Sequence, residues 1–278
     1  MQSSVSMGLE ELALFNELFS SKFGLHFPEH KREILESRLL PRLRANHLQR
    51  FSDYYLLLQY DFQQELDPLT RAITNNESYF FRETSQFDSL KGDVIKELIQ
   101  GGRTGSLNVL SAGCSSGEEP YTLNIYLRAL YPVADPRTLR IDGVDLDSER
   151  LAQAASARYR PGSLRALDDE QTRRYFDSVG EDSYELRSAY REGVHFRGGN
   201  ILEPVTLRRG LPYDAVFCRN VLIYFSEPAL KTAIDHFSQI VRPGGLLYLG
   251  HSESIIGLSD AFQAERLGQC IAYRRKVT

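Results

Sequence analysis

The first part of the chain repeats apolar residues at the spacing of amphipathic helices. Gly24 follows the first repeat, and we expect the next helix to begin at Pro28. Pro41 interrupts the apolar stripe of that second helix, and we expect it to kink or restart the helix because proline removes a backbone donor. Four helices are predicted, at residues 9–23, from 28, at 52–60 and at 62–74. The pattern predicts a small all-helical N-terminal domain.

After residue 83, short apolar runs alternate with helical patterns. Buried strands are predicted at 107–112, 139–144, 213–218 and 246–250. Helices are predicted at 84–100, ending at Gly101-Gly102, then from 118, at 148–157, and at 228–241, ending at Pro243-Gly244-Gly245. Runs at 262–267 and 270–274 predict a closing antiparallel hairpin. The fold class predicted is α/β with a largely parallel sheet.

Residues 158–200 depart from this alternation. We expect a helix at 167–176 and short strands at 184–186 and 194–196 around polar turns. They predict a small antiparallel β-insertion at about 178–199. A further stretch, 131–138, separates the first two strands.

Composition and charge exclude several classes of protein. The chain has 278 residues and a formal net charge of -4, so it shows no general attraction to nucleic acid. Cys114, Cys218 and Cys270 lie far apart and form no CxxC pair, which favours a reducing compartment and no structural zinc. The N-terminus lacks the basic region of a signal peptide, and no apolar run is long enough to span a bilayer. We expect a soluble cytoplasmic protein.

The segment 113–121, reading GCSSGEEPY, is the first candidate site. Gly113 and Gly117 bracket a polar turn, and Glu118 and Pro120 stand where a helix would begin. A strand, a glycine turn and a helix together form a nucleotide-type cradle. Its acids argue against a triphosphate and fit a ligand with ribose hydroxyls and an amino group, such as S-adenosylmethionine. The alternative interpretation is an ordinary strand-to-helix turn.

Polar residues at two other strand ends belong to the same candidate site. Asp145 follows the strand at 139–144, where dinucleotide-binding folds place the acid that binds ribose hydroxyls. Arg219 and Asn220 follow the strand at 213–218. Open α/β sheets bind ligands at this edge, so the three side chains are expected near the cradle.

Two segments outside the sheet carry competing interpretations. The linker 74–83, reading TNNESYFFRE, either packs its aromatic residues at a domain interface or presents its polar residues to a ligand, and both can hold. The second helix carries a basic run that is either a solvated face or a docking surface for an acidic partner. That run consists of Lys31, Arg32, Arg38, Arg42, Arg44 and Arg50.

The chain resembles the CheR-type chemoreceptor glutamate O-methyltransferases, almost from end to end. Five motifs carry the resemblance, and they occur in the family's order: KREILESRLLPRLRANHL, TNNESYFFRE, GCSSGEEPY, FCRNVLIYF and GGLLYLGHSES. The resemblance implies a Rossmann-like S-adenosylmethionine-dependent methyltransferase sheet with a helical N-terminal domain and the small β-insertion. It implies a docking domain and linker at residues 1–82 and a catalytic domain at 83–278.

By resemblance, the enzyme transfers a methyl group from S-adenosylmethionine to glutamate side chains on the cytoplasmic helices of chemoreceptors. The products would be glutamate 5-O-methyl esters, which serve chemotaxis adaptation, and S-adenosylhomocysteine. Cofactor contacts carried over by motif are Asn76, Ser78, Arg82, Glu118, Asp145, Asn200, Ile201, Arg219 and Asn220. Ser78 stands where the family often has threonine, and the hydroxyl is kept.

The resemblance also assigns residues to catalysis and docking. It places Arg82 and Tyr224 at the reaction centre, and Arg38 and Arg44 against the receptor. An acceptor carboxylate is ionised near neutral pH, so no general base is needed. His251 is expected to order a loop rather than to act as a base.

One departure concerns the partner. Family members that bind a receptor C-terminal peptide have a longer, glycine-containing loop in the insertion, whereas residues 178–183 here read SVGEDS. Peptide tethering is therefore not expected, and the chain is expected to be a monomer. Alternatives are a methyltransferase of this fold acting on another signalling protein or on a small molecule, and a cofactor-binding regulatory module without turnover.

Overall fold

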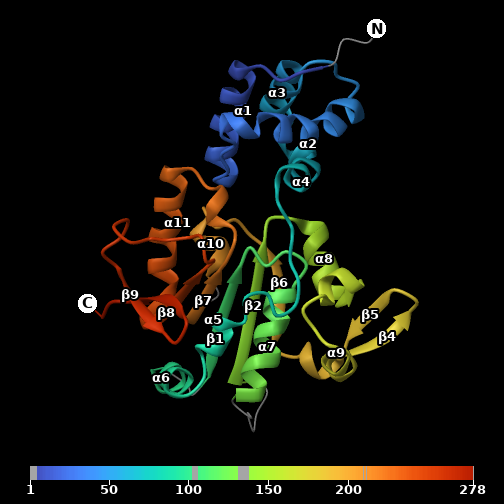
Figure 1. The fold of residues 1–278 in the computed structure, drawn as a ribbon. Helices are drawn as coiled ribbons and strands as arrows, with labels where there is room; N and C mark the ends of the chain where they lie inside the picture. Colours follow the sequence, from blue (N-terminus) through green and yellow to red (C-terminus); the bar gives the residue numbers. More distant parts are fainter. Residues whose placement is uncertain (1–4, 102–105, 131–137, 209, 211, 278) are drawn as a thin grey trace. The chain divides into compact units, whose positions relative to one another are not determined.

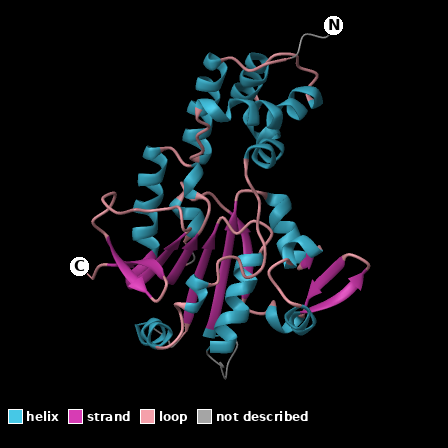
Figure 2. Ribbon diagram, in the orientation of Figure 1, coloured by secondary structure: helices cyan, strands magenta, loops and turns pink. Residues whose placement is uncertain are grey.

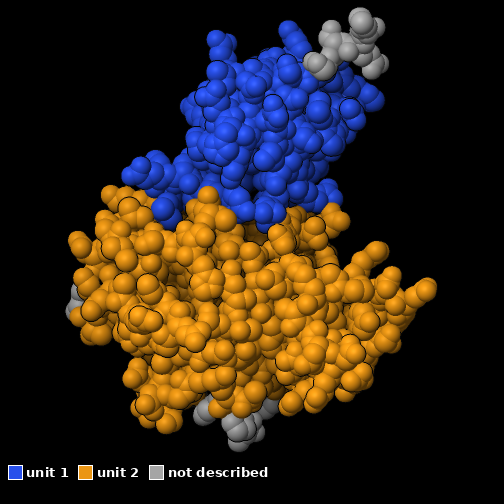
Figure 3. Space-filling model, viewed as in Figure 1, with its two compact units in different colours: residues 1–75, 224–230 blue, residues 76–223, 231–278 orange. Residues whose placement is uncertain are grey.

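The computed structural model describes residues 5–101, 106–130, 138–208, 210 and 212–277. The chain forms two compact units: unit 1 comprises residues 1–75 and 224–230, and unit 2 comprises 76–223 and 231–278 (Figure 3). The linker residues 76–82, predicted to belong with the N-terminal domain, are therefore part of unit 2. The predicted stretch 131–138 lies outside the described residues except for Thr138, and so does Gly102.

Unit 1 is helical, as predicted (Figure 1). Gly24, with φ of 79°, ends the first helix, and a 3-10 turn, η1 (Glu29–Lys31), precedes the second. The second helix continues through Pro41, so of the two predicted effects, a kink or a restart, the restart is wrong. Burial of its leucine stripe outweighs the backbone hydrogen bond that proline removes. The helices are α1 (Leu9–Phe23), α2 (Arg32–Ala45), α3 (Phe51–Tyr60) and α4 (Phe62–Ile73).

A buried polar cluster fixes α2 against α3 and α4. Nε and Nη2 of Arg42 donate to the two carboxylate oxygens of Glu65 at 3.0 and 2.5 Å. The Tyr54 hydroxyl and the Asn46 side-chain amide donate to the same carboxylate at 2.8 and 2.9 Å. Burial alone would raise the pKa of Glu65, but these hydrogen bonds outweigh it and lower the pKa below its ordinary value. Arg42 is thus a structural residue within the basic run.

We expect Glu65→Gln to destabilise the protein by roughly 1.5–3 kcal/mol at pH 7, because it removes the charge of a buried, hydrogen-bonded pair. A lowered folded-state pKa contributes stability above the unfolded pKa of about 4.3, and that contribution is lost as pH falls through the folded-state pKa. Parent and variant should therefore converge in acid. Urea denaturation at pH 7 and below pH 4 measures this. The control is Asp53→Asn in the exposed Arg50–Asp53 pair. An equal loss in both variants would contradict the structural role of Glu65.

Unit 2 is built on a seven-stranded sheet of order β6-β2-β1-β7-β8-β10-β9. The first five strands in that order run parallel, and β10 pairs antiparallel with both β8 and β9. The strands are β1 (Leu107–Ala112), β2 (Leu139–Asp145), β6 (Val194–Gly198), β7 (Tyr213–Cys218), β8 (Val241–Leu249), β9 (Phe262–Leu267) and β10 (Cys270–Arg275). The parallel sheet and the closing hairpin were both predicted.

Helices accompany the sheet (Figures 1 and 2). They are α5 (Ser85–Asp88), α6 (Asp93–Gly101), α7 (Glu118–Leu130), α8 (Ser148–Ser156), α9 (Asp169–Tyr175), α10 (Pro204–Leu207) and α11 (Glu227–Ile240), with 3-10 turns η3 (Pro161–Leu164), η4 (Ser188–Tyr190) and η5 (Leu222–Tyr224). The apolar strands are buried because helices flank them. Within the sheet, Phe217 of β7 stacks on Tyr248 of β8, with 4.4 Å between the ring centroids.

Two predicted helices in unit 2 have different bounds. The helix predicted at 84–100 is two helices, because Gly92 takes a φ of 69° that a helix does not allow. The helix predicted at 228–241 ends at Ile240, and β8 begins at once and runs through Pro243-Gly244-Gly245. A register shift between β7 and β8 accommodates these residues.

The small antiparallel β-insertion is present, but its strands begin and end earlier in the chain than predicted. A three-stranded antiparallel sheet contains β3 (Arg158–Tyr159), β4 (Phe176–Gly180) and β5 (Ser183–Leu186). Figure 2 shows the β4–β5 hairpin apart from the main sheet. The strand predicted at 194–196 is instead β6, which pairs parallel with β2 at the edge of the main sheet. A short alternating run does not by itself reveal which sheet it joins.

Candidate active site

Residues 113–117 form the turn between β1 and α7, at the carboxyl end of the parallel strands. The backbone N–H of Gly113 donates to the carbonyl of Val144 in β2 at 2.8 Å. Gly117 has φ of 89°, and a Cβ there would lie 2.8 Å from the Cβ of Ala154. Only glycine fits this position without displacing α8. The strand–turn–helix cradle predicted from the sequence is confirmed.

Asp145 is the last residue of β2 and is 8% exposed. Its Oδ2 accepts a hydrogen bond from the backbone N–H of Ser115 at 2.7 Å, and its Oδ1 accepts one from Asp147 at 2.9 Å. Burial raises the pKa of this carboxyl, although backbone hydrogen bonds from Asp147, Ser115 and Leu146 oppose the shift. Each oxygen keeps a lone pair for a further donor, as a ribose-binding acid requires.

Asp147 lies beside Asp145 in the candidate site and was not among the residues predicted from the sequence. It accepts hydrogen bonds from the backbone of Glu149 and Arg150 and so caps α8. Its Oδ2 also accepts from the Asn76 side-chain amide at 2.8 Å, while the Asn76 carbonyl accepts from the Ser115 hydroxyl at 3.1 Å. The cap position before residue 148 was the available signal. Asp147 joins the linker to the cradle.

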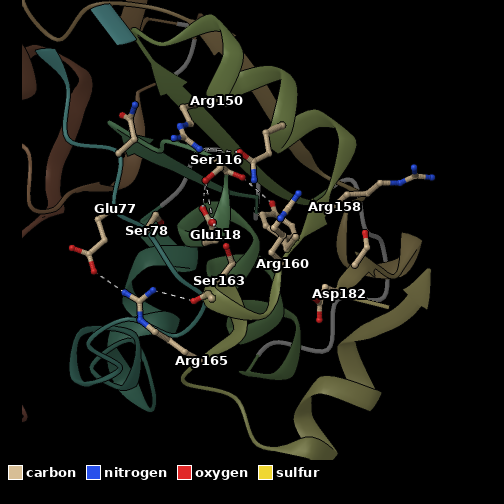
Figure 4. Close-up of a pocket in the computed structure, with 15 residues that line it drawn as sticks. Glu77, Ser78, Ser116, Glu118, Arg150, Arg158, Arg160, Ser163, Arg165 and Asp182 are labelled. Carbon is tan, nitrogen blue, oxygen red and sulfur yellow. Dashed lines mark hydrogen bonds and ion pairs between the residues drawn. The ribbon is translucent and has the colours of Figure 1, made fainter. Parts of the chain in front are cut away.

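A polar cleft of about 750 Å³ lies beside this junction, entirely within unit 2 (Figure 4). Asn76, Ser78 and Glu118, three of the predicted cofactor contacts, line it together. The sequence analysis missed the arginines that surround them, because long basic side chains on short elements give no periodic signal. These are Arg150, Arg158, Arg160 and Arg165.

Glu118 is a buried carboxylate in this cleft that pairs with none of its arginines in the part of the chain that the structure describes. It is 1% exposed, and both oxygens accept from the Ser116 hydroxyl, at 3.0 and 2.9 Å. The Ser163 hydroxyl donates to Oε1 at 3.0 Å. Among the described residues Glu118 forms no ion pair. A buried carboxylate without a cation is costly, so the site fits a ligand that brings positive charge.

At the end of β7, Asn220 adopts a left-handed conformation with φ of 60°. Its backbone N–H donates to Oε2 of Glu253 at 3.1 Å, and the N–H of Ile223 donates to Oε1 at 3.1 Å. Burial raises the pKa of Glu253 against the hydrogen bonds it accepts. Glu253 was missed, although it lies in the motif GHSES beside His251. It orders the loop that carries Asn220.

The side chain of Arg219 points into the protein. It is 2% exposed and pairs with Glu83 and Glu119 at 2.9 and 3.0 Å. Its Nη2 also donates to the carbonyl of Arg82 at 2.8 Å. The resemblance predicted a cofactor contact at Arg219, whereas these guanidinium contacts are all to other parts of unit 2.

Asn200 and Ile201 follow β6, the neighbour of β2. The N–H of Gly199 donates to the backbone carbonyl of Asp145 at 3.0 Å, which brings the two strand ends together. The side chain of Asn200 accepts from the N–H of Leu202 at 3.0 Å and shapes the loop. Both predicted residues are buried at the same edge of the sheet as Asp145.

The linker residues 76–83 pack into unit 2. Phe80 is fully buried, with its ring centroid 4.8 Å from that of Tyr159. Nη1 of Arg82 donates to the carbonyl of Glu77 at 2.9 Å, and its guanidinium lies 5.7 Å from the ring centroid of Tyr79. The aromatic residues therefore pack in a core, while Asn76, Glu77 and Ser78 line the cleft.

The remaining predicted residues belong to unit 1. Nη1 of Arg38 donates to the carbonyl of Ile73 at 2.8 Å, whereas Arg44 is exposed. The Tyr224 hydroxyl accepts from the Asn75 side-chain amide at 2.6 Å. Asn75 precedes the predicted contact Asn76 in the linker motif, and the sequence analysis missed it as a partner of Tyr224.

The described residues contain no group of three or more histidine, cysteine, aspartate or glutamate side chains arranged to hold a metal ion. No described helix combines the length and hydrophobicity required of a membrane span.

The parallel sheet with its closing hairpin, together with the glycine turn and acidic cradle, defines a methyltransferase that binds S-adenosylmethionine. The chain belongs to the CheR methyltransferase family. The domain described as "CheR methyltransferase, SAM binding domain" matches residues 76–270, and "CheR methyltransferase, all-alpha domain" matches residues 10–74.

Curated relatives cover most of the chain. "Chemotaxis protein methyltransferase 2" of Vibrio cholerae is 32% identical over 260 residues, 93% of this chain and 90% of that protein. "Chemotaxis protein methyltransferase" of Salmonella typhimurium is 34% identical over 250 residues, 88% of this chain and 84% of its own. "Probable biofilm formation methyltransferase WspC" of Pseudomonas putida is 30% identical over 94% of this chain and 61% of that protein.

Proposed function

We propose that the chain transfers the methyl group of S-adenosylmethionine to glutamate side-chain carboxylates of chemoreceptors, as a protein-glutamate O-methyltransferase of chemotaxis adaptation. The main support is the family membership of both units, together with relatives that bear the name chemotaxis protein methyltransferase. The product would be a glutamate 5-O-methyl ester.

The residues of unit 2 fit the cofactor. Glu118, a buried carboxylate without an ion pair among the described residues, would hold the cofactor's amino group. Asp145, whose oxygens each retain a lone pair, would accept from the ribose hydroxyls. The further proposed contacts are Asn76, Ser78, Arg82, Asn200, Ile201, Arg219 and Asn220. Cofactor chemistry supplies a methyl group on a positively charged sulfonium.

The protein's own contribution would be positioning and exclusion of water. An acceptor glutamate is ionised at neutral pH, so no side chain needs to remove a proton. Holding the reacting groups in line can remove a large part of the activation free energy of methyl transfer. Arg82 would pair with a carboxylate, either of the cofactor's methionyl end or of the acceptor. Tyr224 would position the reacting groups through its hydroxyl, which Asn75 orients.

We propose that α2 docks the receptor through Arg38 and Arg44, since the methylated region is expected to be rich in glutamate. A substitution of Arg44 tests docking more directly than one of Arg38. The side chain of Arg38 also donates to the carbonyl of Ile73 at the end of α4, so its loss would disturb unit 1. Among the described residues Arg44 forms no ion pair that its loss would disturb.

We expect Arg44→Glu to raise the KM for a receptor fragment about tenfold, the loss of one to two kcal/mol of charge attraction across an interface. The kcat and the cofactor affinity should stay at parent values. The salt dependence of kcat/KM should also flatten, since exposed charges are screened within about 8 Å at physiological salt. The control is Lys22→Glu, which changes charge equally on an exposed residue of α1. A KM equal to that of the parent would indicate that the basic run of α2 is only a solvated helix face.

Calorimetry followed by transfer assays tests the function itself. S-adenosylmethionine should bind to the whole chain, and label from the donor methyl should then appear on a chemoreceptor cytoplasmic fragment. Binding without transfer to any protein indicates a regulatory module. Transfer to another signalling protein, with none to receptors, would replace the proposed substrate.

A further inference from the structure

An ionic cluster lies around the buried side chain of Arg219 at the carboxyl end of β7. Arg219 donates from Nη1 to Oε2 of Glu119 at 3.0 Å and from Nη2 to Oε2 of Glu83 at 2.9 Å. The Ser111 hydroxyl donates to the other oxygen of Glu119 at 2.7 Å. The guanidinium also lies over the ring of Phe87, 5.0 Å from its centroid. Cation, two carboxylates and hydroxyl thus form one connected network from four separate segments.

The network contacts a stretch of backbone that adopts an unfavourable conformation. Phe81 and Glu83 both have positive φ, 59° and 54°, although neither is glycine. Arg82 lies between them, and its carbonyl accepts from Nη2 of Arg219 at 2.8 Å. Left-handed backbone at non-glycine residues persists only where surrounding contacts hold it, and it concentrates at functional sites. Arg219 contacts both the strained residue Glu83 and the carbonyl before it.

Arg82 links this turn to a residue that lines the cleft. Nη1 of Arg82 donates to the carbonyl of Glu77 at 2.9 Å, and Glu77 and Ser78 line the cleft. The turn at residues 81–83 sets the direction in which Arg82 leaves the chain. A relaxed turn would move the guanidinium of Arg82 without removing any cleft residue.

We propose that Glu83 and Glu119 are positioning residues for methyl transfer, acting through Arg219 to hold Arg82 in its hydrogen bond to the carbonyl of Glu77. This inference rests on the proposed function, in which Arg82 acts in the reaction. Neither glutamate contacts the cleft through its own carboxylate, and a purely structural role would stabilise unit 2 without acting through Arg82.

A double-mutant cycle separates these roles. Glu83→Gln should lower kcat about tenfold, the loss of one charge-assisted hydrogen bond, while the protein remains folded. In the Arg82→Ala background the same substitution should lower kcat less than about twofold, because the residue it positions is already gone. Receptor fragment and S-adenosylmethionine are the substrates, and thermal unfolding checks each variant.

Two further variants complete the experiment. Glu119→Gln should reproduce the cycle, which keeps the inference testable where Glu83→Gln does not fold. Glu265→Gln, in the partly exposed Arg274–Glu265 pair of the β9–β10 hairpin, should leave kcat at the parent value in both backgrounds.

The outcomes distinguish the inference from the function on which it rests. Parent-like turnover in Arg82→Ala would overturn the role of Arg82 itself, and the positioning role with it. A slow Arg82→Ala combined with parent-like Glu83→Gln and Glu119→Gln, or with fully additive losses, would overturn the positioning role alone.

Discussion

Replacing Asp145 by alanine is expected to weaken S-adenosylmethionine binding by roughly 1–3 kcal/mol, because the ribose hydroxyls would lose their buried acceptor. The same change leaves the backbone N–H groups of Ser115 and Asp147 without a partner, so the turn itself loosens. Asp145→Asn keeps the volume but retains one acceptor oxygen. It should fall between the parent and Asp145→Ala.

Isothermal calorimetry on the whole chain measures these affinities, with Asp169→Ala in α9 as the exposed control. Thermal unfolding separates a loosened turn from a lost ligand contact. Unchanged cofactor affinity in a folded Asp145→Ala protein would remove Asp145 from the binding site.

The second large effect is expected at the reaction centre. Arg82→Ala should lower kcat roughly ten- to a hundredfold, the loss of one charge-assisted contact of about 1.5–3 kcal/mol. Interactions made mainly in the transition state appear in kcat rather than in KM alone. Tyr224→Phe, which removes only the hydroxyl bonded by Asn75, should lower kcat in the same direction.

Steady-state kinetics with saturating donor and receptor fragment decide this point. Tyr273→Phe is the matched control, since its hydroxyl contacts the backbone N–H of Ile255 and the hydroxyl of Ser254 away from the proposed contacts. If Arg82→Ala and Tyr224→Phe turn over like the parent, both residues are structural, and the reaction centre lies elsewhere.

Local patterns predicted much of this fold. The runs at 107–112 and 213–218 are strands because they are apolar and bounded by turn residues, and the cradle at 113–117 follows from two glycines before an acidic helix start. These signals lie within a few residues of each other. The candidate site around Glu118 and Asp145 was predictable for the same reason.

Other features depend on distant partners and were not predictable. Residues 194–198 join the main sheet because β2 lies beside them, which a short run cannot reveal. The side chain of Arg219 points inward because it pairs with Glu83, which is distant from Arg219 in the sequence. The partly buried carboxylate of Glu253 accepts from the backbone N–H groups of Asn220 and Ile223, which lie in another segment.

The chemical identity of the methylated product decides whether the chain is a glutamate O-methyltransferase. The chain is incubated with methyl-labelled S-adenosylmethionine and a chemoreceptor cytoplasmic fragment, and the fragment is then mapped by mass spectrometry before and after mild alkali. We expect label on glutamate side chains that mild alkali releases, as an ester requires. Alkali-stable label on another residue type, or no label on the fragment while the cofactor binds, would contradict this activity.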